Sequence, residues 1–415
     1  MNIIFLTISD IKRINISDIY ADLIRQFRDD GHQVHIVSPT ERKRKTPTQL
    51  IETDGIKILK VKTLNIQKTN VVEKGIGTLM VERLYKIAIK RYLPNVQFDL
   101  ILYTTPPITF TNVVTFLKRR NPQAISYLLL KDIFPQNAVD IGMFGKKSIF
   151  YWFFRKKEIS LYKSSDFIGC MSPANVEFLR KNNPFIPYEN IEIAPNSIEL
   201  KKDIKPIDKN AIKEKYQIPI NKIIFLYGGN LGKPQGIDFL IECLDANKNR
   251  EDCHFVIVGN GTEYYKLESW HKHHKDSNVT LLQRLPKEDY DLLAQSCDIG
   301  MIFLDHRFTI PNYPSRLLPY MEYKKPVICA TDPNTDIGKI AEENGYGFWC
   351  ESNNVQAFTS LVDKYTRNPE IIPIMGQSGY KFLSNNYLTV HTYRVIMRHF
   401  PQMNDKGIDK DISSK

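Results

Sequence analysis

The chain has 415 residues, of which 42% are hydrophobic and 25% are charged, and its formal net charge is +11. This length and composition predict two globular domains, and no apolar run reaches the roughly 20 residues that would cross a bilayer, which excludes a helical membrane protein. The six cysteines stand singly inside apolar segments, without zinc-like spacing, so buried free thiols in a reducing compartment are predicted. The positive charge favours an anionic partner, namely a nucleotide, a nucleic acid or a membrane surface.

The first half of the sequence alternates strand-like and helix-like segments. Residues 2–7 have the pattern of a buried strand, residues 16–27 that of an amphipathic helix, and residues 33–37 that of the next strand. Further strands are predicted at 56–61, 100–103, 125–130, 167–171 and 191–194. Strands that alternate with helices predict an α/β domain, with a parallel sheet covered on both faces.

The second half repeats this pattern after a polar, lysine-rich stretch at 201–210, which we interpret as a linker. Its strands are predicted at 222–227, 255–258, 279–282, 299–304 and 327–330, with helices from Gly236, Glu263, Lys287 and near Ser315. The sequence thus predicts one domain at 1–200 and another at 211–385. An amphipathic segment at 387–400 is expected to return to the first domain, and the polar residues 404–415 are expected to be a disordered tail.

A glycine-rich turn at 227–236 leads from the first strand of the second domain into a helix. Glycines let backbone N–H groups approach an anion, and a helix start adds partial positive charge, so this turn suits a phosphate. Lys233 in the turn would neutralise that charge. A tight strand-to-helix turn without a ligand is the alternative.

Two later segments could also contact an anionic ligand. Gly259 and Gly261 follow the next strand and suit either close approach of a ligand or a helix start. In the segment 311–322, Ser315 is predicted to cap a helix with Arg316 in its first turn. An arginine is electrostatically misplaced at a helix start unless an anion docks beside it, although a solvated arginine is the alternative.

These three segments, in this order and spacing, resemble glycosyltransferase family 4. The resemblance covers nearly the whole chain and implies the GT-B fold, in which two doubly wound domains face each other across a cleft and hold a nucleotide sugar. The family is metal-independent and retains anomeric configuration, so no cofactor and no metal ligand are implied. The segments 131–140, 228–236 and 310–326 look like the bacterial branch that handles N-acetylated amino sugars, such as fucosamine, in O-antigen or capsule synthesis.

The sequence departs from the family pattern at the ribose site. The family places two glutamates eight positions apart near the donor ribose, and here those positions hold Pro311 and Pro319. Glu322, about one helical turn further on, is the candidate replacement.

A second departure lies in the first glycine turn, where many members carry arginine and lysine. This chain has Asn230 and Gln235 there, which leaves Lys233 and Arg316 as the cations for the pyrophosphate. The donor-binding residues implied by the resemblance are Gly228, Gly229, Asn230, Gln235, Gly236, Gly259, Gly261, Ser315 and Glu322. Without a metal, Lys233, Arg316 and the glycine turn must stabilise the departing diphosphate.

The candidate acceptor-side residues lie in the first domain. Asp132 follows a buried strand and, by the resemblance, lies near the acceptor or the reacting carbon, where it orients the acceptor hydroxyl. A cap for the following turn is its alternative role. Lys131 and Asn137 belong to the same segment. Asn15 and Ser17 follow the first strand, and capping the next helix is the alternative to a contact with substrate.

Two segments of the first domain combine basic and apolar side chains. Residues 145–157 alternate lysine and aromatic clusters, and residues 77–93 carry four cations among leucines and isoleucines. Both patterns suit the surface of an anionic membrane. In this branch the acceptor is typically a polyprenyl-diphosphate-linked saccharide, so a cytoplasmic enzyme held on the inner face of the plasma membrane is expected. The alternative is that the aromatics are core residues with a solvated rim of lysines.

The sequence therefore predicts a glycosyltransferase that moves a sugar, implied to be an N-acetylated amino or deoxyamino hexose, from a UDP-sugar to a lipid-linked saccharide. A nucleotide-sugar epimerase of GT-B fold is the alternative enzyme. A catalytically silent GT-B binding protein is the alternative of another class. Nucleic-acid binding is disfavoured because no recognised module accompanies the charge.

Overall fold

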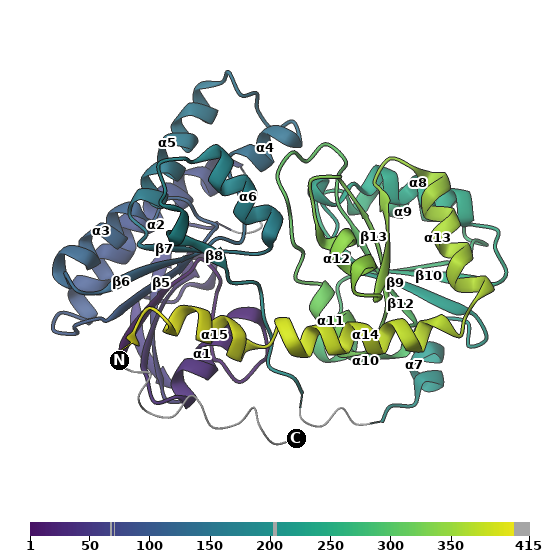
Figure 1. Cartoon of the computed structure of the whole chain (residues 1–415), viewed down its shortest axis with the longest axis horizontal. Helices are drawn as coiled ribbons and strands as arrows, with labels where there is room; N and C mark the ends of the chain where they lie inside the picture. Colours follow the sequence, from purple (N-terminus) through teal and green to yellow (C-terminus); the bar gives the residue numbers. More distant parts are fainter. Residues whose placement is uncertain (67–68, 70, 202–205, 402–415) are drawn as a thin grey trace. The chain divides into compact units, whose positions relative to one another are not determined.

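The computed structural model describes residues 1–66, 69, 71–201 and 206–401. The tail predicted at 404–415 lies outside the described residues, as do residues 202–205 of the predicted linker. The chain divides into two compact units (Figure 1). Of the described residues, unit 1 contains 1–135, 144–199 and 388–401, and unit 2 contains 136–143 and 200–387.

Unit 1 is built on an eight-stranded sheet in the order β3-β4-β2-β1-β5-β6-β7-β8. Its strands are β1 (Asn2–Leu6), β2 (Gln33–Glu41), β3 (Gln49–Thr53), β4 (Ile56–Thr63), β5 (Leu100–Thr104), β6 (Ile125–Leu129), β7 (Phe167–Cys170) and β8 (Ile191–Ile193). Its helices include α1 (Ile19–Asp29), α2 (Val71–Tyr92), α3 (Thr111–Arg120), α5 (Ile149–Lys163), α6 (Pro173–Asn182) and α15 (Thr389–Met397). Because helices cover both faces, the central strands are almost continuously apolar and buried (Figure 1).

One strand of unit 1 was not predicted. β3 pairs antiparallel with β4, whereas the other pairs in this sheet are parallel. A two-residue turn joins them, with Asp54 at φ 52° and Gly55 at φ 74°. Positive φ at both positions is the geometry of a type I′ hairpin, so the Asp-Gly pair was an available signal.

The last helix, α15, packs within unit 1 against α1. The ring of Tyr393 meets Phe27 of α1 edge-on at a centroid distance of 5.0 Å. The Thr392 hydroxyl donates to the Pro195 carbonyl at 3.1 Å, and the phenol of Tyr393 also reaches His32 at 3.1 Å. The chain therefore ends its described part in the first unit after passing through the second.

Unit 2 is built on a six-stranded parallel sheet in the order β11-β10-β9-β12-β13-β14. Its strands are β9 (Ile223–Asn230), β10 (Cys253–Asn260), β11 (Val279–Leu282), β12 (Ile299–Phe303), β13 (Val327–Thr331) and β14 (Gly347–Glu351). Its helices are α4 (Gln136–Asp140), α7 (Lys209–Lys215), α8 (Ile237–Asn247), α9 (Tyr264–His273), α10 (Lys287–Ser296), α11 (Leu317–Glu322), α12 (Ile337–Glu343), α13 (Val355–Arg367) and α14 (Ile371–Asn386). The sequence pattern had not indicated α12, β14, α13 or α14.

The cysteines and the hydropathy of the helices agree with the composition of the sequence. All six cysteines are buried and free, which confirms the predicted thiols. Among the helices in the described ranges, none is long and apolar enough to cross a membrane.

Candidate functional site

The two glycine turns of unit 2 begin inside strands and not in loops as predicted. β9 continues through Gly228 and Gly229, and β10 continues through Gly259, with Gly259 the register partner of Gly229. A Cβ on Gly259 would overlap the carbonyl oxygen of Gly229. Because neither residue has a side chain, the two backbones stay paired to the carboxyl ends of their strands. This places bare backbone at the edge where parallel sheets bind ligands.

Arg316 lies against this bare backbone. Its Cζ is 4.5 Å from the ring centroid of Tyr227, and its Nη2 is 3.3 Å from the position that a Cβ of Gly229 would occupy. Its Nη1 is buried and has no hydrogen-bond partner among the described residues. Burial opposes the charge, but the surrounding phenols of Tyr227 and Tyr320 hold the pKa of Arg316 above its ordinary value. A buried donor without an acceptor is costly, and an oxygen atom of a ligand would supply the acceptor that this guanidinium lacks.

Two further tyrosines build the wall around Arg316, and sequence reasoning missed both. The backbone N–H of Gly228 donates to the phenol oxygen of Tyr320 at 3.2 Å, and that phenol donates to the Leu226 carbonyl at 3.1 Å. A Cβ on Gly228 would overlap the phenol of Tyr290. Tyr320 stands four positions after Arg316, which is helical spacing and the one signal that could have found it.

The prediction that Ser315 caps a helix is wrong. α11 begins at Leu317, its N-cap residue is Arg316, and no side chain caps it by a hydrogen bond. Ser315 is exposed in the preceding turn. Arg316 is held by aromatic contacts and not by a capped helix start.

Lys233 lines a cavity of about 550 Å³ whose walls come from the segments after β9, β10, β12 and β14. The other cations in this cavity are paired: Lys266 contacts Asp238 at 2.8 Å, and Arg307 contacts Asp305 at 2.8 Å. In the described ranges Lys233 forms no ion pair, so its ammonium is available to an anion. Among those residues, no cluster of three or more His, Cys, Asp or Glu is arranged to hold a metal ion.

The turn after β9, residues 230–236, is closed by hydrogen bonds to its own side chains. The amide of Asn230 donates to the Gln235 side-chain oxygen at 2.7 Å, and Gly232 N–H donates to the same oxygen at 3.3 Å. Gly236 then starts α8 with φ at 58°. Gly261 lies so close to the Leu231 backbone that a Cβ would overlap it. Asn230 and Gln235 therefore set the shape of the turn.

Glu322 is buried near the end of α11. Its carboxylate accepts a hydrogen bond from the Lys201 backbone N–H at 3.0 Å, and the Lys201 ammonium lies 4.0 Å away. Burial raises the pKa of Glu322 in spite of these contacts. The structure thus gives this carboxylate a role in holding the start of unit 2, and its contact with a ribose stays a prediction.

In unit 1, Asp132 follows β6 at the carboxyl end of the sheet. The Thr105 hydroxyl, after neighbouring β5, donates to the Asp132 carbonyl at 3.2 Å and accepts from the Lys131 N–H at 3.0 Å. Burial raises the pKa of Tyr20 to about 12, and the negative charges of Asp18 and Asp132 add to that rise. Asp132 therefore lies at the carboxyl end of the sheet, in the position expected for a ligand-binding group of a parallel sheet.

The other acceptor-side candidates are dispersed. Lys131 points its ammonium inward to the Ala194 carbonyl at 3.2 Å, and burial lowers its pKa to about 7. Asn15 is exposed, and the Ser17 hydroxyl donates to Asp22 at 2.9 Å.

Neither Asn15 nor Ser17 caps α1. Asp18 does so by accepting from the N–H groups of Tyr20 and Ala21. Asn137 lies in α4, which groups with unit 2, where Asp140 accepts from the Thr309 N–H at 2.8 Å.

Comparison with known proteins agrees with this geometry. Residues 208–382 match the family Glycosyl transferases group 1. The chain is 26% identical over 272 residues to the probable glycosyltransferase WbjE of Pseudomonas aeruginosa, across 64% of this chain and 66% of that protein. It is also 26% identical over 180 residues to the putative colanic acid biosynthesis glycosyl transferase WcaI of Escherichia coli K12, across 42% and 43% of the two chains. The match thus spans just under two thirds of WbjE and less than half of WcaI.

Solved structures extend the likeness to the whole fold. Sucrose-phosphate synthase from Thermosynechococcus elongatus superposes with a TM-score of 0.74 at 13% identity, over 98% of this chain and 100% of that one. Anabaena Alr3699/HepE in complex with UDP-glucose gives 0.68 at 16% identity, over 97% and 100%. The predicted GT-B fold is confirmed, and unit 2 contains a glycosyltransferase domain, in agreement with the predicted enzyme class.

Proposed function

We propose that this chain transfers a sugar from a UDP-sugar to a polyprenyl-diphosphate-linked saccharide in the synthesis of a surface polysaccharide, O-antigen or capsule. In this proposal the reaction retains anomeric configuration and needs no metal. The transferred sugar is an N-acetylated amino or deoxyamino hexose. The name of WbjE supports a glycosyltransferase, and the name of WcaI, which includes colanic acid biosynthesis, supports a biosynthetic one. The UDP-glucose complex of HepE supports a uridine nucleotide as the donor, and the sugar rests on the family-branch resemblance.

One observation carries the donor site: the buried Arg316 Nη1 has no partner and lies beside the bare backbone of Gly229. A diphosphate oxygen supplies the acceptor that this donor lacks, and the cation offsets the anionic charge. Lys233, which follows Gly229 by four positions in the turn after β9, would bind a second phosphate oxygen.

The reaction itself replaces one bond at the anomeric carbon. The acceptor hydroxyl forms a new bond to that carbon and passes its proton to an oxygen of the departing β-phosphate, while the bond from carbon to the β-phosphate oxygen breaks and UDP leaves with the electron pair. Arg316, Lys233 and backbone N–H groups would stabilise the charge that grows on the diphosphate. Asp132 would orient the acceptor hydroxyl.

The membrane part of the proposal rests on an exposed aromatic surface, which we call the α5 patch and define as residues 145–157. Phe150 is 62% exposed and Trp152 is 64% exposed, and Ile149 and Phe153 are exposed beside them. Lys146, Lys147 and Lys156 are exposed in the same segment. Phe150, Trp152 and Phe153 are therefore surface residues and not core residues. Aromatic rings beside lysines suit a lipid interface with anionic headgroups.

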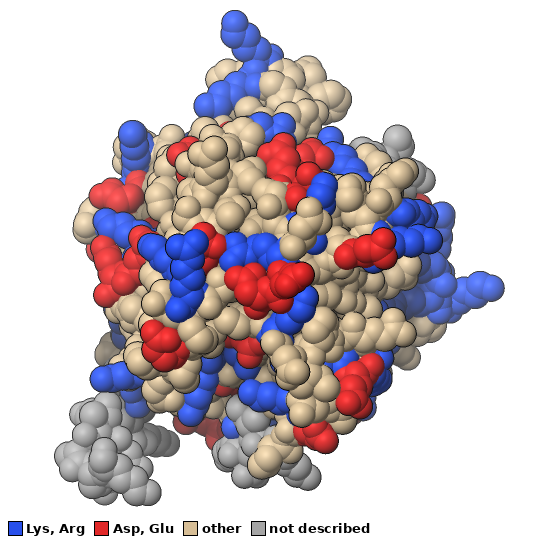
Figure 2. All heavy atoms as spheres, turned by 90° about the vertical axis from the view of Figure 1, so that its right-hand side faces the viewer, with Lys and Arg blue, Asp and Glu red and all other residues tan. Residues whose placement is uncertain are grey.

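The distribution of charged side chains agrees with a membrane contact that is confined to one part of the surface. On the face shown in Figure 2, basic and acidic side chains are interspersed over the middle of the view. Basic side chains project at the top of this view, and Lys146 and Lys147 are exposed in the segment that leads into α5. If this segment faces the membrane, its lysines would lie beside anionic lipid headgroups.

The experiment that tests the function is a transfer assay. The protein is incubated with a panel of UDP-sugars, with and without a polyprenyl-diphosphate-linked saccharide, and both UDP release and the glycosylated lipid are measured. Acceptor-dependent UDP release with a new glycolipid supports the proposal. Conversion of the nucleotide sugar without acceptor would show an epimerase, and no turnover with any donor would show a binding protein.

A further inference from the structure

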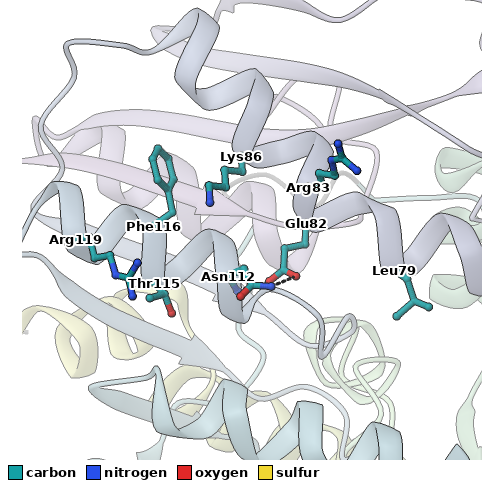
Figure 3. Close-up of a pocket in the computed structure, with 8 residues that line it drawn as sticks. All are labelled: Leu79, Glu82, Arg83, Lys86, Asn112, Thr115, Phe116 and Arg119. Carbon is teal, nitrogen blue, oxygen red and sulfur yellow. Dashed lines mark hydrogen bonds between the residues drawn. The ribbon is translucent and has the colours of Figure 1, made fainter.

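A pocket of about 400 Å³ lies on unit 1 between α2 and α3 (Figure 3). Arg83 and Lys86 from α2 and Arg119 from α3 line it, together with the ring of Phe116. On α2 these positions continue a stripe of helical spacing, and on α3 they share one face. Two neighbouring helices thus contribute three cationic residues to the lining of one pocket.

These cations lack acidic partners. In the part of the chain that the structure describes, Arg83, Lys86 and Arg119 form no ion pair. The ammonium groups of Lys86 and Lys90 instead lie 5.4 and 5.3 Å from the centroid of the Phe116 ring. Lys86 and Lys90 are four positions apart on one helix, where like charges repel. An anion in the pocket would relieve this repulsion.

The pocket also contains a carboxylate, but that carboxylate is already used. Glu82 is buried, and it accepts from the backbone N–H of Asn112 and, at 2.8 Å, from the Asn112 side-chain amide. It thereby serves the first turn of α3. Three cations against this one carboxylate leave the pocket at a net charge of +2.

The helix that supplies two of these cations, α2, also exposes apolar side chains. Ile76, Leu79, Met80 and Ile87 of α2 are large exposed hydrophobic residues, with Ile87 53% exposed. Leu79 lines the pocket itself and lies at the opposite end from Arg119 in Figure 3. A polar anion alone gains nothing from such neighbours. A phosphate attached to an acyl chain would satisfy the cations and the hydrophobic residues together.

We infer that the pocket between α2 and α3 binds the phosphodiester headgroup of an anionic membrane lipid. The inference rests on the membrane part of the proposed function, and it adds a defined headgroup site that is separate from the strand-end residues assigned to catalysis. Arg83 and Arg119 present planar N–H donors that match phosphate oxygens, and Lys86 adds a point charge.

The test uses the full chain and a matched pair of variants. Arg83→Gln/Arg119→Gln removes two charges from the pocket, and Lys62→Gln/Lys181→Gln removes two from exposed positions elsewhere on unit 1. Co-sedimentation is measured with vesicles of phosphatidylcholine alone and of phosphatidylcholine with phosphatidylglycerol. Calorimetry measures binding of inorganic phosphate. Thermal unfolding confirms that the variants fold, and Arg83→Lys/Arg119→Lys keeps the charge but loses the paired donors.

We expect binding to phosphatidylglycerol vesicles to fall at least tenfold in the glutamine pocket variant and less than twofold in the control, with the lysine variant between them. Equal losses in both variants, or a wild type that ignores these vesicles, would overturn the headgroup site. Tight binding of inorganic phosphate, lost in the pocket variant while vesicle binding persists, would overturn it in favour of a free phosphate ligand.

The transfer assay with a soluble acceptor separates this inference from the proposed function. Normal transfer by the pocket variant is the expected result. A chain that shows no transfer but binds vesicles through the pocket would disprove the proposed reaction and leave the headgroup site intact.

Discussion

The guanidinium carbon of Arg316 lies 4.5 Å from the centre of the Tyr227 ring, at the end of the strand that carries the glycine pair. This contact joins a residue after β12 to one inside β9. It holds a cation over an aromatic face, so the charge is stabilised during burial while one N–H group remains unsatisfied. Both properties would suit the proposed binding and release of a diphosphate.

Removing the cations should impair both binding and turnover. We expect Arg316→Ala and Lys233→Ala each to lower turnover more than tenfold, which corresponds to about 1.4 kcal/mol in the barrier. Affinity for UDP should also fall, because the same groups contact the diphosphate in the ground state. Steady-state kinetics and calorimetry are the measurements, with Lys339→Ala, at an exposed position of α12, as the control. Near-normal turnover in both variants would mean that the pyrophosphate lies elsewhere.

The close pairing of β9 with β10 should leave no room for a side chain at Gly259. Gly259→Ala would push a methyl group into the Gly229 carbonyl, so we expect a lower unfolding temperature and weaker UDP binding. Overpacking of this kind costs about 1–3 kcal/mol. Gly145→Ala is the matched control because a Cβ there meets no atom within 4 Å. If both alanine variants unfold like the wild type, the close pairing of these strands is not required.

Nucleotide binding should need no metal. We expect UDP to raise the unfolding temperature in the presence of a chelator, because Arg316, Lys233 and backbone N–H groups supply the positive charge. A thermal-shift titration with UDP, with chelator and then with added magnesium, is the measurement. A shift that occurs only after magnesium is added would contradict the metal-free proposal.

Asp132 should matter for transfer and not for nucleotide affinity. Asp132→Asn keeps the size of the side chain but removes its charge, so we expect loss of transfer with unchanged UDP affinity. Asp132 belongs to unit 1, whereas the glycine turns belong to unit 2. Transfer kinetics and UDP calorimetry on the same preparation decide this. Full activity, or a parallel fall in UDP affinity, would disprove the acceptor-side role.

The α5 patch should bind anionic vesicles reversibly. Each lysine near an anionic surface contributes about 1 kcal/mol, and the attraction is screened by salt. We expect co-sedimentation to fall with added salt and with charge reversal at Lys146, Lys147, Lys156 and Lys157. Trp152→Ala should weaken binding even at low salt, because its exposed ring would lose a lipid contact. Binding that ignores salt and all these changes would place the membrane contact elsewhere.

The sequence by itself determined the alternation of strands and helices in both halves and the positions of the glycine turns. These features follow from local properties: the period of apolar residues, the conformational freedom of glycine and the lengths of the buried runs. The Asp54-Gly55 hairpin was equally local, and its signal was present although the strand before it was not predicted.

Only the tertiary structure decided what surrounds each functional side chain. Tyr290 and Tyr320 reach Gly228 from segments more than sixty residues away in sequence. The helical spacing from Arg316 marks Tyr320, but no local pattern indicates that either tyrosine contacts Gly228. The same holds for Glu322, whose carboxylate is occupied by Lys201, and for the pocket formed between α2 and α3. Exposure of Trp152 was likewise undecided, because an aromatic residue on a helix can be core or surface until the packing of its neighbours is known. Burial and partners are properties of segments brought together by folding, and a local pattern does not contain them.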